Sequence, residues 1–122
     1  MADFNLVVLY VEDAQASSAF YQTLLGCPVA QSSPKFVVLP LGNGVMLGLW
    51  QRDAVLPPST SQAGSSEISW AVANAEAVRA TYETWMTRGA QIAQPPTAMP
   101  FGHTFVALDP DGHRLRVLAT AA

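Results

Sequence analysis

With 122 residues, the chain has room for one compact domain with a substantial core. Half of its residues are apolar and only 12% are charged, which excludes a disordered chain. Six basic residues and a formal net charge of −3 provide no electrostatic footprint for nucleic acid or for an anionic membrane surface.

The single cysteine and the amino-terminal segment indicate the cellular compartment in which the protein is expected. Cys27 has no second cysteine with which to form an internal disulfide, and a lone thiol suits a reducing compartment. The first residues contain no basic stretch, and the apolar run after them is short and ends at Glu12. We therefore expect neither a signal peptide nor a membrane span, and a cytoplasmic protein.

The chain begins with a predicted strand and a predicted helix. Residues 4–11 are rich in β-branched and aromatic side chains, which is typical of a strand. Asp13 can cap a helix of about three turns, and Gly26 can end it in the left-handed conformation. Three apolar residues at helical spacing indicate its buried face: Ala16, Phe20 and Leu24.

Three more strands and a connector follow. We expect a short strand near residues 27–31 and a hairpin formed by residues 36–41 and 45–50. The sequence Gly42-Asn43-Gly44 between them is a strong hairpin signal. Residues 51–66 are polar and rich in proline and serine, and we interpret them as a connector.

The same order then begins again. Residues 68–72 are predicted to form a strand. A second helix is expected after it, with Asn74 as its amino-terminal cap and Gly89 at its end. Its predicted buried face carries Val78, Tyr82 and Trp85.

The last elements of the chain complete the second half. We expect a short strand at about residues 90–94, a proline-containing loop over 95–100, and a hairpin of residues 103–108 and 113–118. Asp109-Pro110-Asp111-Gly112 is the predicted turn of that hairpin.

An offset of 61 positions aligns the two halves. It pairs Val11 with Val72 and the capping Asp13 with Asn74. Within the helices it pairs identical residues, namely Ala14 with Ala75, Ala16 with Ala77, Ala19 with Ala80, Tyr21 with Tyr82 and Thr23 with Thr84. We therefore expect one α+β domain over residues 1–122, built from two βαβββ modules at about 4–50 and 67–119 joined by the connector 51–66.

Two groups of motifs carry a family resemblance. One group is Val11-Glu12-Asp13, Ala19-Phe20-Tyr21 and Leu25-Gly26, and the other runs from Phe105 to Asp109-Pro110-Asp111-Gly112-His113. In their order and spacing, over nearly the whole chain, they resemble the glyoxalase / bleomycin-resistance / extradiol-dioxygenase (vicinal oxygen chelate) superfamily. The resemblance implies a cupped mixed sheet with helices on its convex face, commonly completed by dimerisation. We expect a homodimer, and leave open whether the modules pair within one chain or between two.

The resemblance also implies four metal-binding positions, in the first and last strand of each module. They fall on Leu6, Gly48, Glu67 and Arg116. Of these, only Glu67 has a donor atom for a cation, and the charge of Arg116 repels one. Because a divalent metal needs three or four convergent ligands, we expect no metal and no other cofactor.

Strand parity predicts which side chains share the vacant site. Residues an even number of positions apart in a strand lie on the same face of the sheet. Tyr10 is therefore expected on the face of Leu6, Met46 and Trp50 on the face of Gly48, and Arg114 on the face of Arg116. If Leu108 pairs with His113, Phe105 lies opposite Arg116 and His103 opposite Leu118. The predicted ligand-binding residues are Tyr10, Met46, Trp50, Glu67, His103, Phe105, Arg114 and Arg116.

These residues describe an apolar, aromatic trough between the modules, with one acid and guanidinium groups near its centre and with room provided by Gly48. Such a lining suits a planar, partly polar small molecule. Structural alternatives stay open: Arg116 can simply pair with Glu67, and Trp50 can cap the sheet edge. Trp70 and Trp85 are expected in the core, and His113 in solvent.

Three functions are compatible with this trough. The favoured one is a metal-independent protein that sequesters a planar aromatic drug or metabolite, in the manner of the bleomycin-resistance branch. The second is an enzyme of the lyase, isomerase or dioxygenase type with a diverged site, using His103 or Glu67 as acid or base. The third is a structural or regulatory dimer. We predict no catalytic residues, because no nucleophile and base are paired in the sequence.

Overall fold

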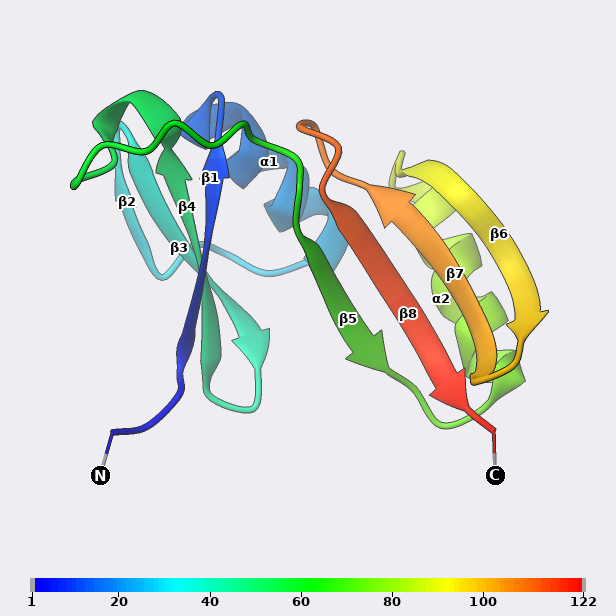
Figure 1. The fold of residues 1–122 in the computed structure, drawn as a ribbon. Coiled ribbons are helices and arrows are strands. Elements are labelled where there is room, and N and C mark those ends of the chain that lie inside the picture. Colours follow the sequence, from blue (N-terminus) through cyan, green and yellow to red (C-terminus); the bar gives the residue numbers. More distant parts are fainter. Residues whose placement is uncertain (1, 122) are drawn as a thin grey trace. The chain divides into compact units, whose positions relative to one another are not determined.

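The computed structural model describes residues 2–121, which divide into two compact units, one ending at Gly64 and the other beginning at Ser65 (Figure 1). We call them the first and the second module. The first contains β1 (Leu6–Val11), α1 (Ala14–Leu25), β2 (Gln31–Ser33), β3 (Phe36–Gly42), β4 (Val45–Gln51) and the short 3₁₀ helix η1 (Arg52–Ala54). The second contains β5 (Glu67–Ala71), α2 (Ala75–Thr87), β6 (Gln91–Met99), β7 (Gly102–Leu108) and β8 (Arg114–Thr120).

Each module is one four-stranded mixed sheet with one helix. The strand order is β1-β4-β3-β2 in the first module and β5-β8-β7-β6 in the second. In both, the first strand pairs in parallel with the last, and the other pairs are antiparallel. The predicted α+β fold of two tandem βαβββ modules is therefore confirmed.

The ends of α1 form as the sequence predicts, but its buried face differs. The Asp13 carboxylate accepts hydrogen bonds from the backbone N–H groups of Gln15 and Ala16, and Gly26 ends the helix at a φ of 66°. The predicted face is confirmed at Leu24, which is buried, and wrong at Ala16, which is exposed, and at Phe20, which is only half-buried. The buried residues are Ala14, Ser17, Ser18, Tyr21 and Leu24. The buried face includes two serines, Ser17 and Ser18, which a prediction based on apolar residues alone does not include.

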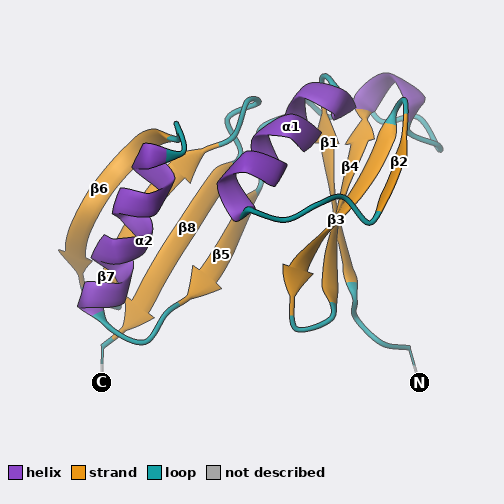
Figure 2. Ribbon diagram, turned by 180° about the vertical axis from the view of Figure 1, so that it is seen from behind, coloured by secondary structure: helices purple, strands orange, loops and turns teal. Residues whose placement is uncertain are grey.

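Helix α2 covers one face of the second module's sheet, as Figure 2 shows. Its predicted face is confirmed at Val78 and Trp85, which are buried. Trp70 from β5 meets Trp85 edge-to-face at 5.5 Å between ring centroids. Both tryptophans therefore belong to the helix–sheet interface, as expected.

Strand β6 replaces the predicted proline-containing loop. It runs from Gln91 to Met99, and its register against β7 shifts between Ile92 and Gln94 and between Gln94 and Thr97. Pro95 and Pro96 lie inside the second shift. Proline has no backbone N–H and cannot donate a hydrogen bond to a neighbouring strand. An edge strand tolerates it at a bulge, where the regular pairing is interrupted.

Among the described residues, neither helix has the length and apolar character needed to cross a membrane.

Candidate ligand-binding site

The sheet of the first module has a buried face and an open face. Alternate residues on the three long strands are fully buried on the helix side: Leu9, Val11, Val37, Leu39, Leu47 and Leu49. The residues between them point to the opposite side, which we call the first open face. Its large side chains are Leu6, Val8, Tyr10, Phe36, Val38, Met46 and Trp50. The shared face predicted for Tyr10, Met46 and Trp50 is thus confirmed.

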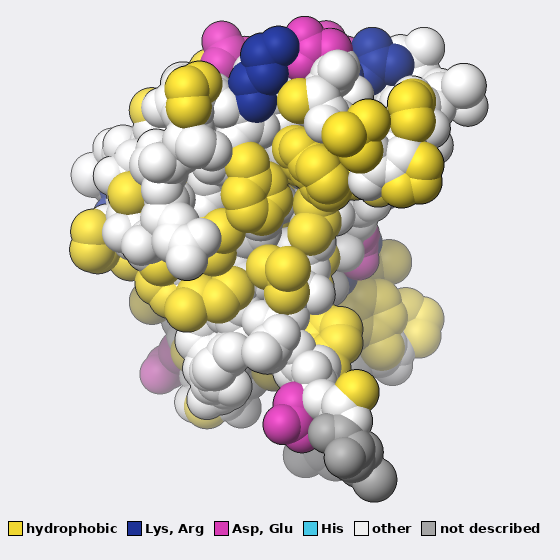
Figure 3. All heavy atoms as spheres, turned by 90° about the vertical axis from the view of Figure 1, so that its left-hand side faces the viewer, with side chains coloured by type: hydrophobic (Ala, Val, Ile, Leu, Met, Phe, Trp, Pro, Cys, Tyr) yellow, Lys and Arg dark blue, Asp and Glu magenta, His cyan; other side chains and the backbone are white. Residues whose placement is uncertain are grey.

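Three aromatic rings form one row across this open face. Register pairs Trp50 with Tyr10 on one side and with Phe36 on the other. The Trp50 ring centroid lies 6.4 Å from that of Tyr10 and 5.7 Å from that of Phe36, both edge-to-face. All three side chains are half-buried. Figure 3, a space-filling view, shows apolar side chains exposed among polar ones over the first module.

Gly48 does not leave the empty space that the sequence predicted. A Cβ atom at this position would lie 3.2 Å from two atoms of the Phe36 ring and 3.3 Å from Val8 Cγ2. The ring of Phe36 therefore covers the glycine. Strand parity across the Gly42-Asn43-Gly44 hairpin was the signal that could have identified Phe36.

The sheet of the second module also has an open face, opposite α2, and it is charged. Register pairs Glu67 with Arg114, and Ser69 with Arg116. Val106 on β7 is the other partner of Arg116. The shared face predicted for Glu67, Arg114 and Arg116 is therefore confirmed, and this second open face carries polar groups where the first carries rings.

Phe105 and His103 do not lie on the second open face. The Asp109 N–H donates to the His113 carbonyl, so β7 and β8 pair Leu108 with Arg114 instead of His113. A register change of one residue moves each side chain to the other face of the sheet. Phe105 is consequently fully buried, with its centroid 5.5 Å from Tyr82 and 5.4 Å from Trp85 on α2.

His103 pairs with Ala119 and is exposed on the helix side of the sheet. It lines a hollow of about 380 Å³ together with the cap of α2 at Asn74. The position predicted for His103, opposite Leu118 and on the face of Arg116, was therefore wrong for the same reason of register.

His113 is buried, not solvated. Its side chain is 3% exposed, and its Nδ1 lies 2.7 Å from Asp109 Oδ2. The other Asp109 oxygen, Oδ1, accepts from the N–H groups of Asp111 and His113. The carboxylate thus organises the whole turn and holds the imidazole against it.

Arg116 is held in place by two neighbours. Its Nε and Nη2 donate to the Glu67 carboxylate at 3.2 and 3.4 Å, and its Nη1 donates to Thr104 Oγ1 at 3.3 Å. The pair is partly exposed, with 18% of the Arg116 side chain and 39% of the Glu67 side chain accessible. The pairing of Arg116 with Glu67, which the sequence left open as a structural alternative, is present in the structure.

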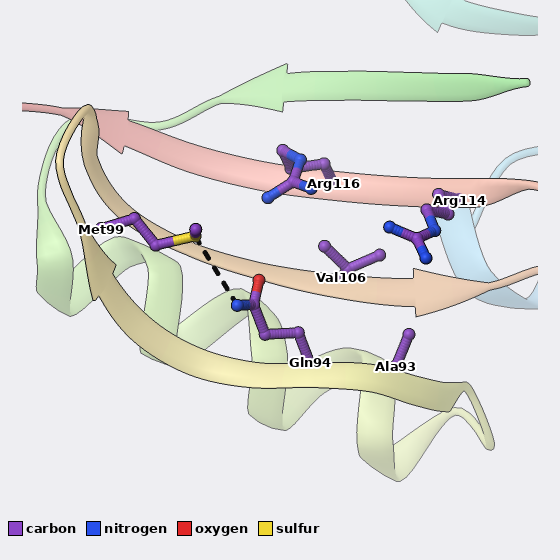
Figure 4. Close-up of a pocket in the computed structure, with 6 residues that line it drawn as sticks. All are labelled: Ala93, Gln94, Met99, Val106, Arg114 and Arg116. Carbon is purple, nitrogen blue, oxygen red and sulfur yellow. Dashed lines mark hydrogen bonds between the residues drawn. The ribbon is translucent and has the colours of Figure 1, made fainter.

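Arg114 differs from Arg116 in its surroundings. Its side chain has no hydrogen bond or ion pair with any residue from 2 to 121, and it is exposed. Both arginines border a pocket of about 340 Å³ on β6, β7 and β8, shown in Figure 4. Its other lining residues are Ala93, Gln94, Met99 and Val106. The Gln94 amide donates to Met99 Sδ at 3.6 Å.

The four inherited metal positions do not fit a divalent cation. Leu6 has an aliphatic side chain, and Gly48 lies beneath the Phe36 ring. Glu67 is already neutralised by the Arg116 guanidinium. One carboxylate bonded to a cation is not a metal site.

A different group of possible metal ligands, which the sequence analysis did not identify, lies in the β7–β8 turn. Donor atoms of Asp109, Asp111 and His113 lie within 4.8 Å of one another. Their contacts with each other, described above, account for the turn structure.

Two βαβββ modules, each with a helix on one sheet face and an open opposite face, define the class of vicinal-oxygen-chelate-type domains. The chain belongs to the glyoxalase/bleomycin resistance protein/dioxygenase superfamily, whose family model matches residues 3–117.

A phenazine antibiotic resistance protein, EhpR of Enterobacter agglomerans, is 26% identical over 116 residues, which are 93% of this chain and 88% of that protein. The solution structure of protein ATC0852 from Agrobacterium tumefaciens is 42% identical, covers 100% of both chains and superposes with a TM-score of 0.86. A superfamily protein from Nocardioides shares the fold, with a TM-score of 0.85 at 22% identity over 98% of this chain and 84% of that one.

Proposed function

We propose that this protein binds a planar aromatic small molecule of the phenazine type, without a metal, and so sequesters it. Each open face, considered by itself, offers proposed contacts for such a molecule. They are Tyr10, Met46 and Trp50 in the first module, and Glu67, Arg114 and Arg116 in the second. Phe105 is left out because it is buried in the core, and His103 because it lies on the other side of its sheet.

The observation that carries the proposal is the aromatic row of Tyr10, Trp50 and Phe36. Three half-buried rings on a face that no helix of the module covers provide a stacking surface for a flat ligand. Soluble proteins rarely expose contiguous apolar surface of this kind unless it has a partner. The similarity to a phenazine antibiotic resistance protein agrees with a tricyclic aromatic compound as that partner.

The composition of the site favours binding over catalysis. The inherited metal positions have one donor side chain, and that carboxylate is bonded to Arg116. On the second open face, the Ser69 hydroxyl donates to Glu67 Oε2 at 3.5 Å, and the same carboxylate is bonded to the Arg116 guanidinium. On both open faces, the described residues include no cysteine or histidine paired with a base. Binding without turnover is therefore the simplest chemistry for these residues.

We also propose that the protein acts in the cytoplasm as a homodimer. The edge strands β1, β2, β5 and β6 carry unpaired backbone groups that association would cover. Sedimentation at micromolar concentration tests this, and a 13 kDa species alone would contradict it.

Calorimetric titration of the protein with phenazine in excess EDTA tests the central proposal. We expect saturable binding in the micromolar range, the same affinity with and without the chelator, and phenazine recovered chemically unchanged after incubation. Chromatographic detection of a product would favour an enzyme instead. No heat of binding at millimolar phenazine would mean that the proposal is wrong.

A further inference from the structure

The pocket between Arg114 and Arg116 suggests what the ligand carries in addition to its rings. Two guanidinium groups from β8 extend over Val106 into a pocket that β6 closes with Ala93 and Gln94 (Figure 4). Only one acidic side chain, Glu67, contacts either of them within the described residues. Two positive charges against one negative charge leave the second open face with a net positive charge at this point.

The two arginines are not equivalent. Arg116 uses three of its five N–H donors on Glu67 and Thr104, so its position is fixed by the protein. Arg114 has no such partner between residues 2 and 121, and all five of its donors remain for another group. A guanidinium fork of this kind matches a carboxylate, which it can bind through two parallel hydrogen bonds.

The rest of the pocket suits the edge of an aromatic ring. Val106 forms a buried floor, and the Met99 thioether lines the same pocket. Methionine sulfur adapts to aromatic surfaces and contacts their edges favourably. A volume of about 340 Å³ is at the small end of the range for ligand pockets, so it accommodates a substituted ring edge and not a whole large drug.

We propose that this pocket binds the carboxylate of an aromatic acid, with Arg114 as the residue that binds the anion and Arg116 as a fixed positive charge behind it. The ligand class is therefore a planar aromatic carboxylic acid. This inference rests on the proposed function, since it names the chemical class of the planar aromatic ligand.

The test compares three flat probes that differ in one substituent: phenazine, phenazine-1-carboxylate and phenazine-1-carboxamide. We expect the carboxylate to bind about tenfold to a hundredfold more tightly than the carboxamide, the range typical of hydrogen bonds to charged groups. Arg114→Met should remove that advantage. Arg114→Lys, which keeps the charge without the fork, should restore part of it.

Arg79→Met is the matched control, because it removes the same charge from the exposed surface of α2, on the other side of the sheet. It should change none of the three affinities. Equal binding of the three probes, or an unchanged carboxylate affinity in Arg114→Met, would overturn the inference while leaving the proposed function in place. Failure of all three probes to bind would overturn both.

Discussion

The two modules have the same fold but opposite chemistry on their open faces. In the first module, the positions that face away from the helix carry Tyr10, Trp50 and Phe36. In the second, the corresponding sheet presents Glu67, Arg114 and Arg116. A duplicated backbone thus keeps its buried residues apolar in both copies while the open residues diverge. Stacking and charge recognition can then evolve on separate surfaces of one small protein.

The largest expected effect is a loss of folding stability when Phe105, on the buried face of the second module's sheet, is truncated. Phe105→Ala removes a fully buried ring between Tyr82 and Trp85, so the free energy of unfolding should fall by about 3–5 kcal/mol. Urea denaturation followed by circular dichroism measures it. Phe101→Ala, in the same module but 43% exposed, is the control and should cost less than about 1 kcal/mol. Similar losses in both variants would mean that Phe105 is not in the core.

The second prediction concerns the aromatic row. Trp50→Ala should weaken phenazine binding by about 2 kcal/mol, roughly thirtyfold, because stacking and buried ring area are both lost. Phe4→Ala removes a ring that is 77% exposed and precedes β1, and it should leave the affinity unchanged. Calorimetric titration gives both values. Full affinity in Trp50→Ala would place the ligand away from the first open face.

The third and smallest effect concerns the Glu67–Arg116 pair. Because it is partly exposed, its coupling energy should be below about 1 kcal/mol. A double-mutant cycle with Glu67→Gln and Arg116→Met, read by thermal unfolding, isolates this energy. Arg116→Met alone leaves the Glu67 charge without its partner, so the double variant should recover part of the lost stability. A coupling energy of zero would assign no stabilising role to the ion pair.

The sequence predicted the fold well because its signals are local. The caps at Asp13 and Asn74, the turn at Asn43 and the repeat offset each depend on a few neighbouring residues, and all are present in the structure. Strand β6 escaped prediction because Pro95 and Pro96 resemble a loop, whereas an edge strand tolerates them at a bulge.

The site was predicted in part, and the errors share one cause. Tyr10, Met46, Trp50, Glu67, Arg114 and Arg116 lie on the predicted faces because each is counted along its own strand. Phe105 and His103 were assigned across a turn, whose length the sequence does not determine. The hydrogen bond from the Asp109 N–H to the His113 carbonyl adds one residue to the turn, and the change of register exchanges the two faces of β7.

The central claim is that a flat aromatic ligand binds the first open face without a metal. Nuclear magnetic resonance of the protein in EDTA tests it most directly, by following the Trp50 indole N–H during a phenazine titration, with the indoles of Trp70 and Trp85 as internal references. We expect a large, saturable shift for Trp50 and small shifts for Trp70 and Trp85. Unchanged Trp50 at saturating phenazine, or a shift that needs added divalent metal, would contradict it.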